Sequence, residues 1–136
     1  MAGYGVFAQV YDKLTLNVPY DQIAEYSDGK IRKFRDGDGN FLADAGCGTG
    51  NLTARLARLG YDVIGAEPSP DMLSEAMNKP HDGVQYICQD MTELDLYGEA
   101  DIIVSTLDSV NHLSSAADIT KFFRAAALNL RRGGLL

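Results

Sequence analysis

The chain has 136 residues and a formal net charge of −7, with 12 basic against 19 acidic side chains. Hydrophobic residues make up 46% of it, which suits one domain with a buried core and excludes a disordered chain. No apolar run approaches the roughly 18 residues of a membrane span, and the first residues lack the basic and apolar regions of a secretion signal. A chain with this excess of acidic side chains shows no sign of the basic surface that binds nucleic acid. We therefore expect a soluble, cytoplasmic domain with no membrane or nucleic-acid partner.

The two cysteines, Cys47 and Cys88, lack the close paired spacing of a zinc site. Two reduced thiols fit a cytoplasmic protein, and a disulfide between them is the less favoured alternative. Cys47 stands before a predicted helix N-terminus, which favours a thiolate, but no histidine lies nearby in sequence to serve as its base. We therefore interpret Cys47 as a small residue fitted under a ligand rather than as a nucleophile, and we expect no metal site.

The first third of the chain predicts two helices, which we interpret as a lid over residues 1–36. Apolar residues at helical spacing predict the first helix over residues 4–16, and Pro19 suits the first turn of the second. We expect Asp28-Gly29 to interrupt this second helix, because glycine is unfavourable inside a helix. Residues 35–40 form a turn-rich loop that resembles a calcium loop only faintly, since the distal Glu is absent.

From residue 41 onward, short apolar strands alternate with amphipathic helices. Strands are predicted at 41–45, 61–66, 84–88 and 101–106, and helices at 51–59, 69–78 and 115–130. Gly133-Gly134 is expected to close the last helix, and the apolar residues after it begin a fifth strand. This order predicts an α/β fold over residues 41–136, a Rossmann-like parallel sheet of four strands plus the start of a fifth, flanked by helices. A strand that begins at the last residues suggests a single domain, 1–136, that is incomplete at its C-terminus.

Polar or glycine residues follow each predicted strand, at the edge where parallel sheets bind ligands. The first strand leads into Gly46-Cys47-Gly48-Thr49-Gly50, whose alternating glycines allow a tight turn and the close approach of a ligand. The helix behind this loop directs bare N–H groups toward that ligand. Glu67 follows the second strand, where a carboxylate can accept hydrogen bonds from both hydroxyls of a ribose. Asp90 follows the third strand and can accept from an exocyclic amine. The residues after the fourth are Thr106, Asp108, Ser109, Asn111 and His112.

The loop fits some nucleotide cofactors poorly. A nicotinamide site has a third glycine where Asn51 stands, and a P-loop has a Lys and a Ser or Thr that are absent here. The loop is instead surrounded by acids, namely Asp44, Glu67 and Asp90. Acids suit a ligand that carries a positive charge and many hydroxyl or amine donors.

These segments resemble the class I S-adenosylmethionine-dependent methyltransferases. Residues 44–50 resemble the first motif of that family, and residues 63–69 with Met72-Leu73 resemble the second. Residues 88–91 resemble the third motif and residues 101–112 the fourth. The N-terminal segments 7–12 and 18–21 are similar to those of a bacterial subgroup of small-molecule methyltransferases.

The resemblance implies S-adenosylmethionine as cofactor and a small molecule as substrate. Gly46 and Gly48 would then approach the methionine part and the ribose, and Asp44 would hold the loop or the amino group. Glu67 would take the ribose hydroxyls, and Asp90 the adenine amine. The implied cofactor-binding residues are Tyr11, Tyr20, Asp44, Gly46, Cys47, Gly48, Glu67, Pro68, Met72, Asp90, Met91 and Thr106.

Alternatives remain at several positions and for the function itself. Tyr11 and Tyr20 either close over the cofactor or pack as ordinary aromatics, and Asp90 either binds adenine or caps a turn. In-line transfer of a methyl group to an N or O atom depends mainly on positioning, and a base is required only if the acceptor must lose a proton. His112 is the weak candidate for that base, and Asp108 is the second choice. The alternative function is a non-catalytic nucleoside-binding, cofactor-binding or interaction module.

Overall fold

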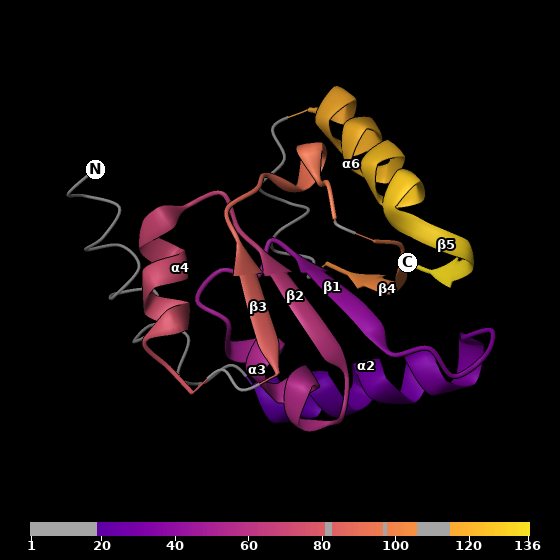
Figure 1. Ribbon diagram of the computed structural model, residues 1–136, viewed down its shortest axis with the longest axis horizontal. Coiled ribbons are helices and arrows are strands. Elements are labelled where there is room, and N and C mark those ends of the chain that lie inside the picture. The colour runs from indigo at the N-terminus through magenta and orange to yellow at the C-terminus, as the bar shows by residue number, and fades with distance from the viewer. Residues whose placement is uncertain (1–18, 81–82, 97, 106–114) are drawn as a thin grey trace.

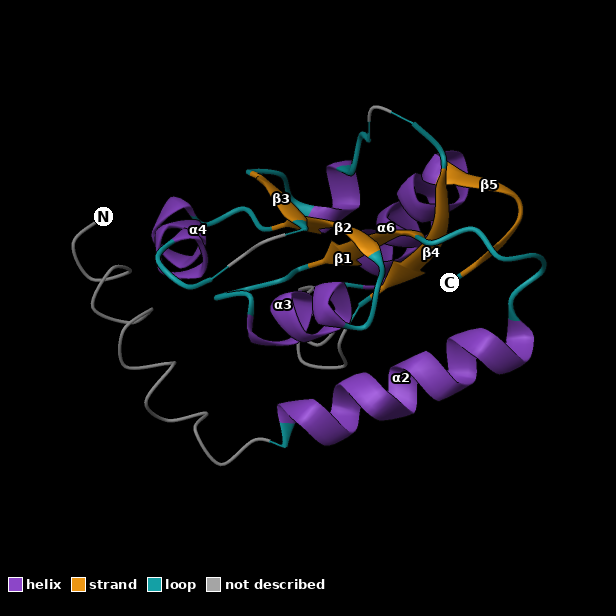
Figure 2. Ribbon diagram, turned by 60° about the horizontal axis from the view of Figure 1, so that its bottom comes forward, coloured by secondary structure: helices purple, strands orange, loops and turns teal. Residues whose placement is uncertain are grey.

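A five-stranded parallel sheet with helices on both faces forms the fold (Figures 1 and 2). The computed structural model describes residues 19–80, 83–96, 98–105 and 115–136. The strands are β1 (Phe41–Ala45), β2 (Asp62–Ala66), β3 (Val84–Ile87), β4 (Ala100–Val104) and β5 (Leu130–Leu135), in the order β3-β2-β1-β4-β5. The helices are α2 (Tyr20–Phe34), α3 (Asn51–Arg58), α4 (Pro70–Met77), the short 3-10 helix η1 (Met91–Glu93) and α6 (Ala116–Asn129).

The register of the central strands brings the ends of β1 and β2 together. Ala45 of β1 stands opposite Ala66 of β2, and Ala66 is level with Ile87 of β3. Because all these strands run in parallel, the segments that follow them leave the sheet at one edge. The predicted parallel sheet and the helices that flank it are confirmed, and the strands end at one edge as expected. Ligand binding at this edge stays a prediction.

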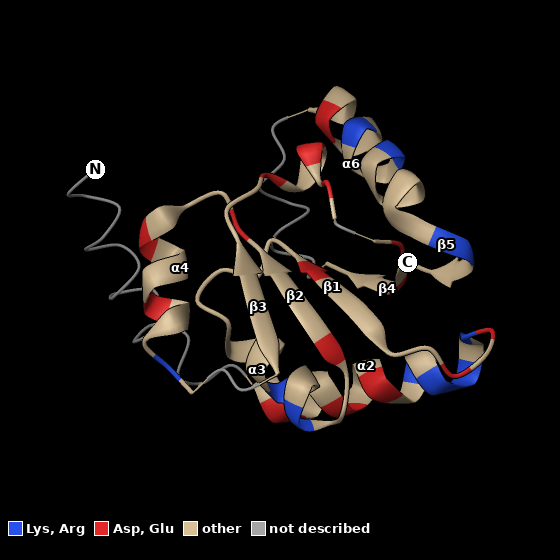
Figure 3. Ribbon diagram, viewed as in Figure 1, with Lys and Arg blue, Asp and Glu red and all other residues tan. Residues whose placement is uncertain are grey.

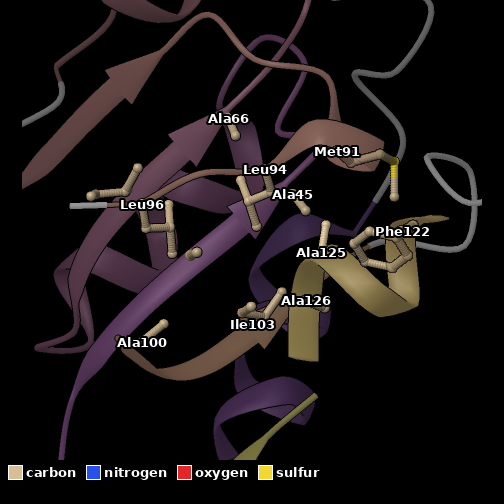
Figure 4. Close-up of a cluster of buried hydrophobic side chains, with 12 residues drawn as sticks. Ala45, Ala66, Met91, Leu94, Leu96, Ala100, Ile103, Phe122, Ala125 and Ala126 are labelled. Atoms are coloured by element: carbon tan, nitrogen blue, oxygen red, sulfur yellow. The ribbon is translucent and has the colours of Figure 1, made fainter. Parts of the chain in front are cut away.

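Alternate residues of β1 face two different hydrophobic clusters, as expected for a strand buried on both faces. Leu42 faces α2 and α3, in a cluster that includes Ala24, Ile31 and Leu56. Ala43 and Ala45 face the other side, against α6 and η1 (Figure 4). Asp44 has the same parity as Leu42, and this places its carboxylate under α3.

The expected break in α2 at Asp28-Gly29 is wrong, because the helix is continuous from Tyr20 to Phe34. Arg32 donates to the Asp28 carboxylate from one turn further along at 3.0 Å, and the Tyr61 hydroxyl donates to it at 2.5 Å. These two partners hold the helix through Gly29, which costs only about 1 kcal/mol relative to alanine at such a position. Two α2 residues, Ala24 and Ile31, are buried in the core. The predicted helix over residues 4–16 lies outside the described residues.

The end of the chain also differs from expectation, since β5 begins at Leu130 directly after α6 and contains both Gly133 and Gly134. The pairing of β5 with β4 shifts register between Ala100 and Ile102, which is typical of a bulge. Gly133 has a φ of +83°, and a Cβ at Gly134 would lie 2.9 Å from a backbone oxygen. The glycines therefore shape this irregular strand and do not close the helix.

None of the helices that the structure describes is long and apolar enough to cross a bilayer.

Asn129, the last residue of α6, supplies the first test of this fold. Its buried side chain accepts a hydrogen bond from Leu96 N–H at 2.8 Å and donates to the carbonyls of Leu94 at 2.7 Å and Ala125 at 2.8 Å. Asn129→Ala leaves a buried N–H and a buried carbonyl without partners, so we expect the free energy of unfolding to fall by about 2–4 kcal/mol. Urea unfolding measures this loss. Leu128→Ala on the exposed side of the helix is the control and should change it by less than about 1 kcal/mol; equal losses would contradict the assigned role.

Candidate functional site

The loop after β1 is built on three glycines in the left-handed region, with φ values of +76° at Gly46, +57° at Gly48 and +81° at Gly50. The N–H groups of Gly46 and Cys47 both donate to the carbonyl of Ala66, at 2.8 and 3.0 Å. The loop is thus fixed to the end of β2. Gly50 is the N-cap of α3 and has no side chain to satisfy the first N–H groups of that helix.

Glu67 connects the loop with the ends of β2 and β3. Its Oε1 accepts from Gly48 N–H at 3.1 Å, its Oε2 accepts from Ser69 N–H at 3.0 Å, and its own N–H donates to the Ile87 carbonyl at 3.1 Å. The side chain is almost fully buried. Glu67 therefore ties the glycine loop to the turn after β2 and to the end of β3.

Asp44 lies beneath α3 and is 1% exposed. Thr53 of α3 donates from its hydroxyl to Asp44 Oδ2 at 2.8 Å, whereas Asp44 Oδ1 is buried with no hydrogen-bond partner among the described residues. Burial raises the pKa of Asp44 from 3.8 to about 6; the Thr53 bond opposes this rise and the nearby charge of Glu67 adds to it. An ionised carboxylate with a bare buried oxygen is costly, and a donor or cation would relieve that cost.

Cys47 is held as a neutral thiol. Burial raises its pKa well above the ordinary range, and the charges of Asp44 and Glu67 raise it further. These effects outweigh the neighbouring helix N-terminus, so the thiolate that a nucleophile needs is disfavoured. Both Cys47 and Cys88 are free, as expected.

Pro68 and Met72 follow Glu67 closely in the chain. Ser69 caps α4 by accepting from Met72 N–H at 3.2 Å, and Met72 is buried whereas Pro68 is exposed. The turn after β2 is thus fixed at both ends, by Glu67 and by the cap.

Asp90 and Met91 lie at the start of η1, after β3. Asp90 Oδ1 accepts from the N–H and the hydroxyl of Thr92, at 2.9 and 2.8 Å, so the turn-capping interpretation of Asp90 is seen directly. The Met91 side chain packs in the cluster against α6, which leaves its backbone as the part available to a ligand. Binding of an adenine ring here stays a prediction.

Tyr20 begins α2 and is half-buried. The guanidinium of Arg55 lies 5.4 Å from the centre of its ring and also pairs with Asp21 at 2.7 Å. Tyr20 therefore packs against α3, and its closing over a ligand stays a prediction. The remaining candidates, Tyr11, Thr106, Asp108, Ser109, Asn111 and His112, lie outside the described residues.

Sequence reasoning missed Thr53 and Tyr86. Thr53 follows the glycine loop in α3, and the contact of its hydroxyl with Asp44 is a consequence of helix geometry that strand-end patterns do not show. Tyr86 lies in β3, and its neighbours Gly50 and Gly65 belong to distant parts of the sequence. An unexplained glycine in the middle of β2 is the one signal in the sequence that points to it.

A groove of about 410 Å³ lies elsewhere, between α2, β4, α6 and the end of β5. Its lining includes Tyr26, Phe34 and Phe123, and it contains no residue of the glycine loop or of the turn after β2. Among the described residues no cluster of His, Cys, Asp or Glu is arranged to hold a metal ion. This groove is thus separate from the candidate site at the carboxyl edge of the sheet.

The geometry of this edge fits S-adenosylmethionine, which carries ammonium and sulfonium charges. A Cβ at Gly48 would meet nothing within 4 Å, so the backbone there is open to close approach. The unpartnered Oδ1 of Asp44 suits a donor, and the two buried acids favour a cation. Acidic residues lie at the described ends of β1 and β3 (Figure 3), and the Lys79 ammonium donates to the Thr49 carbonyl of the glycine loop at 2.9 Å.

Residues 42–134 match a family model described as a methyltransferase domain. The chain belongs to the S-adenosylmethionine-dependent methyltransferase family. It is 34% identical over 136 residues to YqeM of Bacillus subtilis (strain 168), which is named as a methyltransferase, and the match covers 98% of this chain and 53% of YqeM.

Two solved structures agree with this assignment. One is an S-adenosylmethionine-dependent methyltransferase from Clostridium acetobutylicum ATCC 824, with 32% identity, a TM-score of 0.74 and coverage of 96% of this chain and 55% of that one. The other is S-adenosylmethionine-bound CalS10, an amino pentose methyltransferase from Micromonospora echinaspora, with 30% identity, a TM-score of 0.82 and coverage of 93% and 54%. The chain thus spans about half the length of the relatives it matches.

The burial of Asp44 leads to a pH-dependent prediction. Because its pKa is raised to about 6 in the folded protein, its contribution to stability is fully present below pH 3.8 and is lost as pH rises through 6. Asp44→Asn removes the charge and keeps an oxygen for Thr53, so it should raise the free energy of unfolding at pH 8 by about 1–3 kcal/mol. Urea unfolding at several pH values measures this gain, which should vanish below pH 4. Asp62→Asn, at an exposed acid, is the control; a gain that is independent of pH would contradict the prediction.

Proposed function

We propose that the protein to which this chain belongs transfers the methyl group of S-adenosylmethionine to an N or O atom of a small molecule. The observation that carries this proposal is the bare, buried Oδ1 of Asp44 behind a glycine loop that is open at Gly48. A dinucleotide or phosphate ligand would meet two buried acids here, whereas a cationic amino acid nucleoside would be attracted by them.

The proposal assigns a role to each part of the edge. Asp44 faces the amino group of the cofactor, and Gly46 and Gly48 allow the methionine part and the ribose to approach the loop. Glu67 accepts hydrogen bonds from the ribose hydroxyls. Asp90 and the Met91 backbone take the adenine. The residues Tyr11, Tyr20, Cys47, Pro68, Met72 and Thr106 complete the proposed cofactor site.

The reaction we propose is an in-line displacement at the methyl carbon. The acceptor lone pair forms the new bond while the sulfur–methyl bond breaks and its electrons stay on sulfur, which leaves as a neutral sulfide. Positioning therefore supplies most of the catalysis. An amine acceptor only has to be unprotonated, whereas a hydroxyl acceptor has to lose its proton to a base, for which His112 and Asp108 are the candidates.

We favour an amine acceptor, on the basis of the likeness to the amino pentose methyltransferase CalS10. The competing proposal is a module that binds the cofactor without catalysis, and only a transfer assay separates the two. A cytoplasmic location, supported by two free cysteines, is part of the proposal.

Binding and transfer are tested with the full-length protein. Calorimetry should show saturable binding of S-adenosylmethionine, and methyl-labelled cofactor should pass its label to an amino sugar but not to the matching hydroxyl sugar. Binding without transfer to any small amine or hydroxyl acceptor would support the non-catalytic module. No saturable binding would overturn both proposals.

Gly48→Ala tests the open face of the loop. The added methyl group enters the space that we assign to the cofactor, so the dissociation constant for S-adenosylmethionine, measured by calorimetry, should rise at least tenfold. The left-handed backbone should also cost about 1–2 kcal/mol of stability. Gly60→Ala is the matched control: its φ is +106° and its Cβ is also unobstructed, but it lies at the far end of α3. Equal affinities for both variants would count against the assigned role.

A further inference from the structure

Gln89 closes the turn that follows β3. Its side-chain Nε2 donates to the Asp95 carbonyl at 3.0 Å, and the Asp95 N–H donates to its Oε1 at 2.9 Å. One side chain thus satisfies both backbone groups of a single residue, as the backbone of a paired antiparallel strand would. Two bonds in this arrangement fix the separation of residues 89 and 95, and therefore the width of the turn between them.

The back of this turn is anchored to the core by other residues. Met91 and Leu94 pack in the hydrophobic cluster against α6 (Figure 4). Asn129 of α6 donates to the Leu94 carbonyl at 2.7 Å and accepts from the Leu96 N–H at 2.8 Å. None of these contacts involves the side chain of Asp90, which is exposed. The position of that carboxylate therefore depends on how the turn is closed at its base.

The two oxygens of the Asp90 carboxylate have different surroundings. Oδ1 accepts from both the N–H and the hydroxyl of Thr92, at 2.9 and 2.8 Å, whereas Oδ2 accepts no hydrogen bond from the described residues. The carboxylate can thus cap the turn with one oxygen and offer the other to a ligand, so the two interpretations of Asp90 are compatible. A carboxylate oxygen accepts from an amine and repels a carbonyl, and these are the groups that distinguish adenine from hypoxanthine.

We propose that Gln89 is a positioning residue for recognition of the adenine base, acting on Asp90 through the closure of the turn. Its bonds to Asp95 hold the peptide group before Asp90, and Thr92 holds Oδ1, so that Oδ2 is kept in place for the exocyclic amine. A fixed acceptor selects an amine over a carbonyl, whereas an open turn would let the carboxylate move away from either. This inference rests on the proposed function, in which Asp90 takes the adenine of S-adenosylmethionine.

The first experiment compares two ligands by calorimetry on the full-length protein. They are S-adenosylmethionine and its hypoxanthine analogue, in which a carbonyl replaces the exocyclic amine. The wild type should bind S-adenosylmethionine at least about tenfold more tightly than the analogue. Gln89→Ala should weaken the binding of S-adenosylmethionine about three- to tenfold and change the affinity for the analogue by less than about twofold, so that the selectivity falls.

Gln85→Ala is the matched control, because Gln85 is an exposed glutamine of β3 that takes no part in closing the turn. This variant should keep both affinities. Equal weakening of both ligands in Gln89→Ala would show a merely structural role and overturn the inference, as would an unchanged selectivity or a wild type that binds both ligands equally. A wild type that binds neither ligand overturns the proposed function instead.

The second experiment keeps the inference testable if Gln89→Ala folds poorly. Gln89→Met retains the length of the side chain and removes both hydrogen bonds, so it should lose selectivity in the same way. Asp90→Asn should abolish the selectivity, since its amide can donate to the carbonyl of the analogue. Adding Gln89→Met to Asp90→Asn should then weaken the binding of S-adenosylmethionine no further, because both changes act on one contact. Retained selectivity in Gln89→Met, or additive losses in the double variant, would overturn the proposal.

Discussion

The structure at the carboxyl edge of the sheet depends on one buried carboxylate. Asp44 is placed under α3 by the alternation of β1, with Leu42 on the same face and Ala43 and Ala45 on the other. A residue of this parity in a central strand is normally apolar. The aspartate is accommodated because Thr53 returns to it from the next helix, and because the glycine loop between them is tight enough to bring that helix over the strand.

Backbone hydrogen bonds then extend this local arrangement to the neighbouring strands. Ala66 accepts from two loop N–H groups, and Glu67 accepts from Gly48 and Ser69. The loop therefore takes its shape from β2 as much as from its own glycines. Glu67 also raises the pKa of Asp44, so the two acids that shape the site repel each other. Such strain is expected where a site has to bind a cation and is relieved when it does.

The sequence was sufficient for the order of the elements and for the residues at the strand ends, because both depend on local periodicity and on turn chemistry. It failed where the local structure depends on a side chain that is distant in the sequence. The continuity of α2 depends on Tyr61, thirty-three residues beyond Asp28. The early start of β5 goes with an ion pair of 2.5 Å between Arg131 and Asp101. The space for Tyr86 depends on Gly50 and Gly65, and neither glycine reveals from its own neighbours which side chain it admits.

The two acids also bear on the direction of the proposed reaction. In the proposed complex, the sulfonium and ammonium charges of the cofactor would lie near Asp44 and Glu67, and charge interactions are strong for buried groups such as these two acids. Transfer removes the sulfonium charge and leaves a neutral sulfide, so the attraction falls by one charge while the repulsion between the acids remains. On this proposal, the site would bind the cofactor more strongly than its product. The burial of Asp44, which lowers the stability of the protein, would then favour release of the neutral product after each turnover.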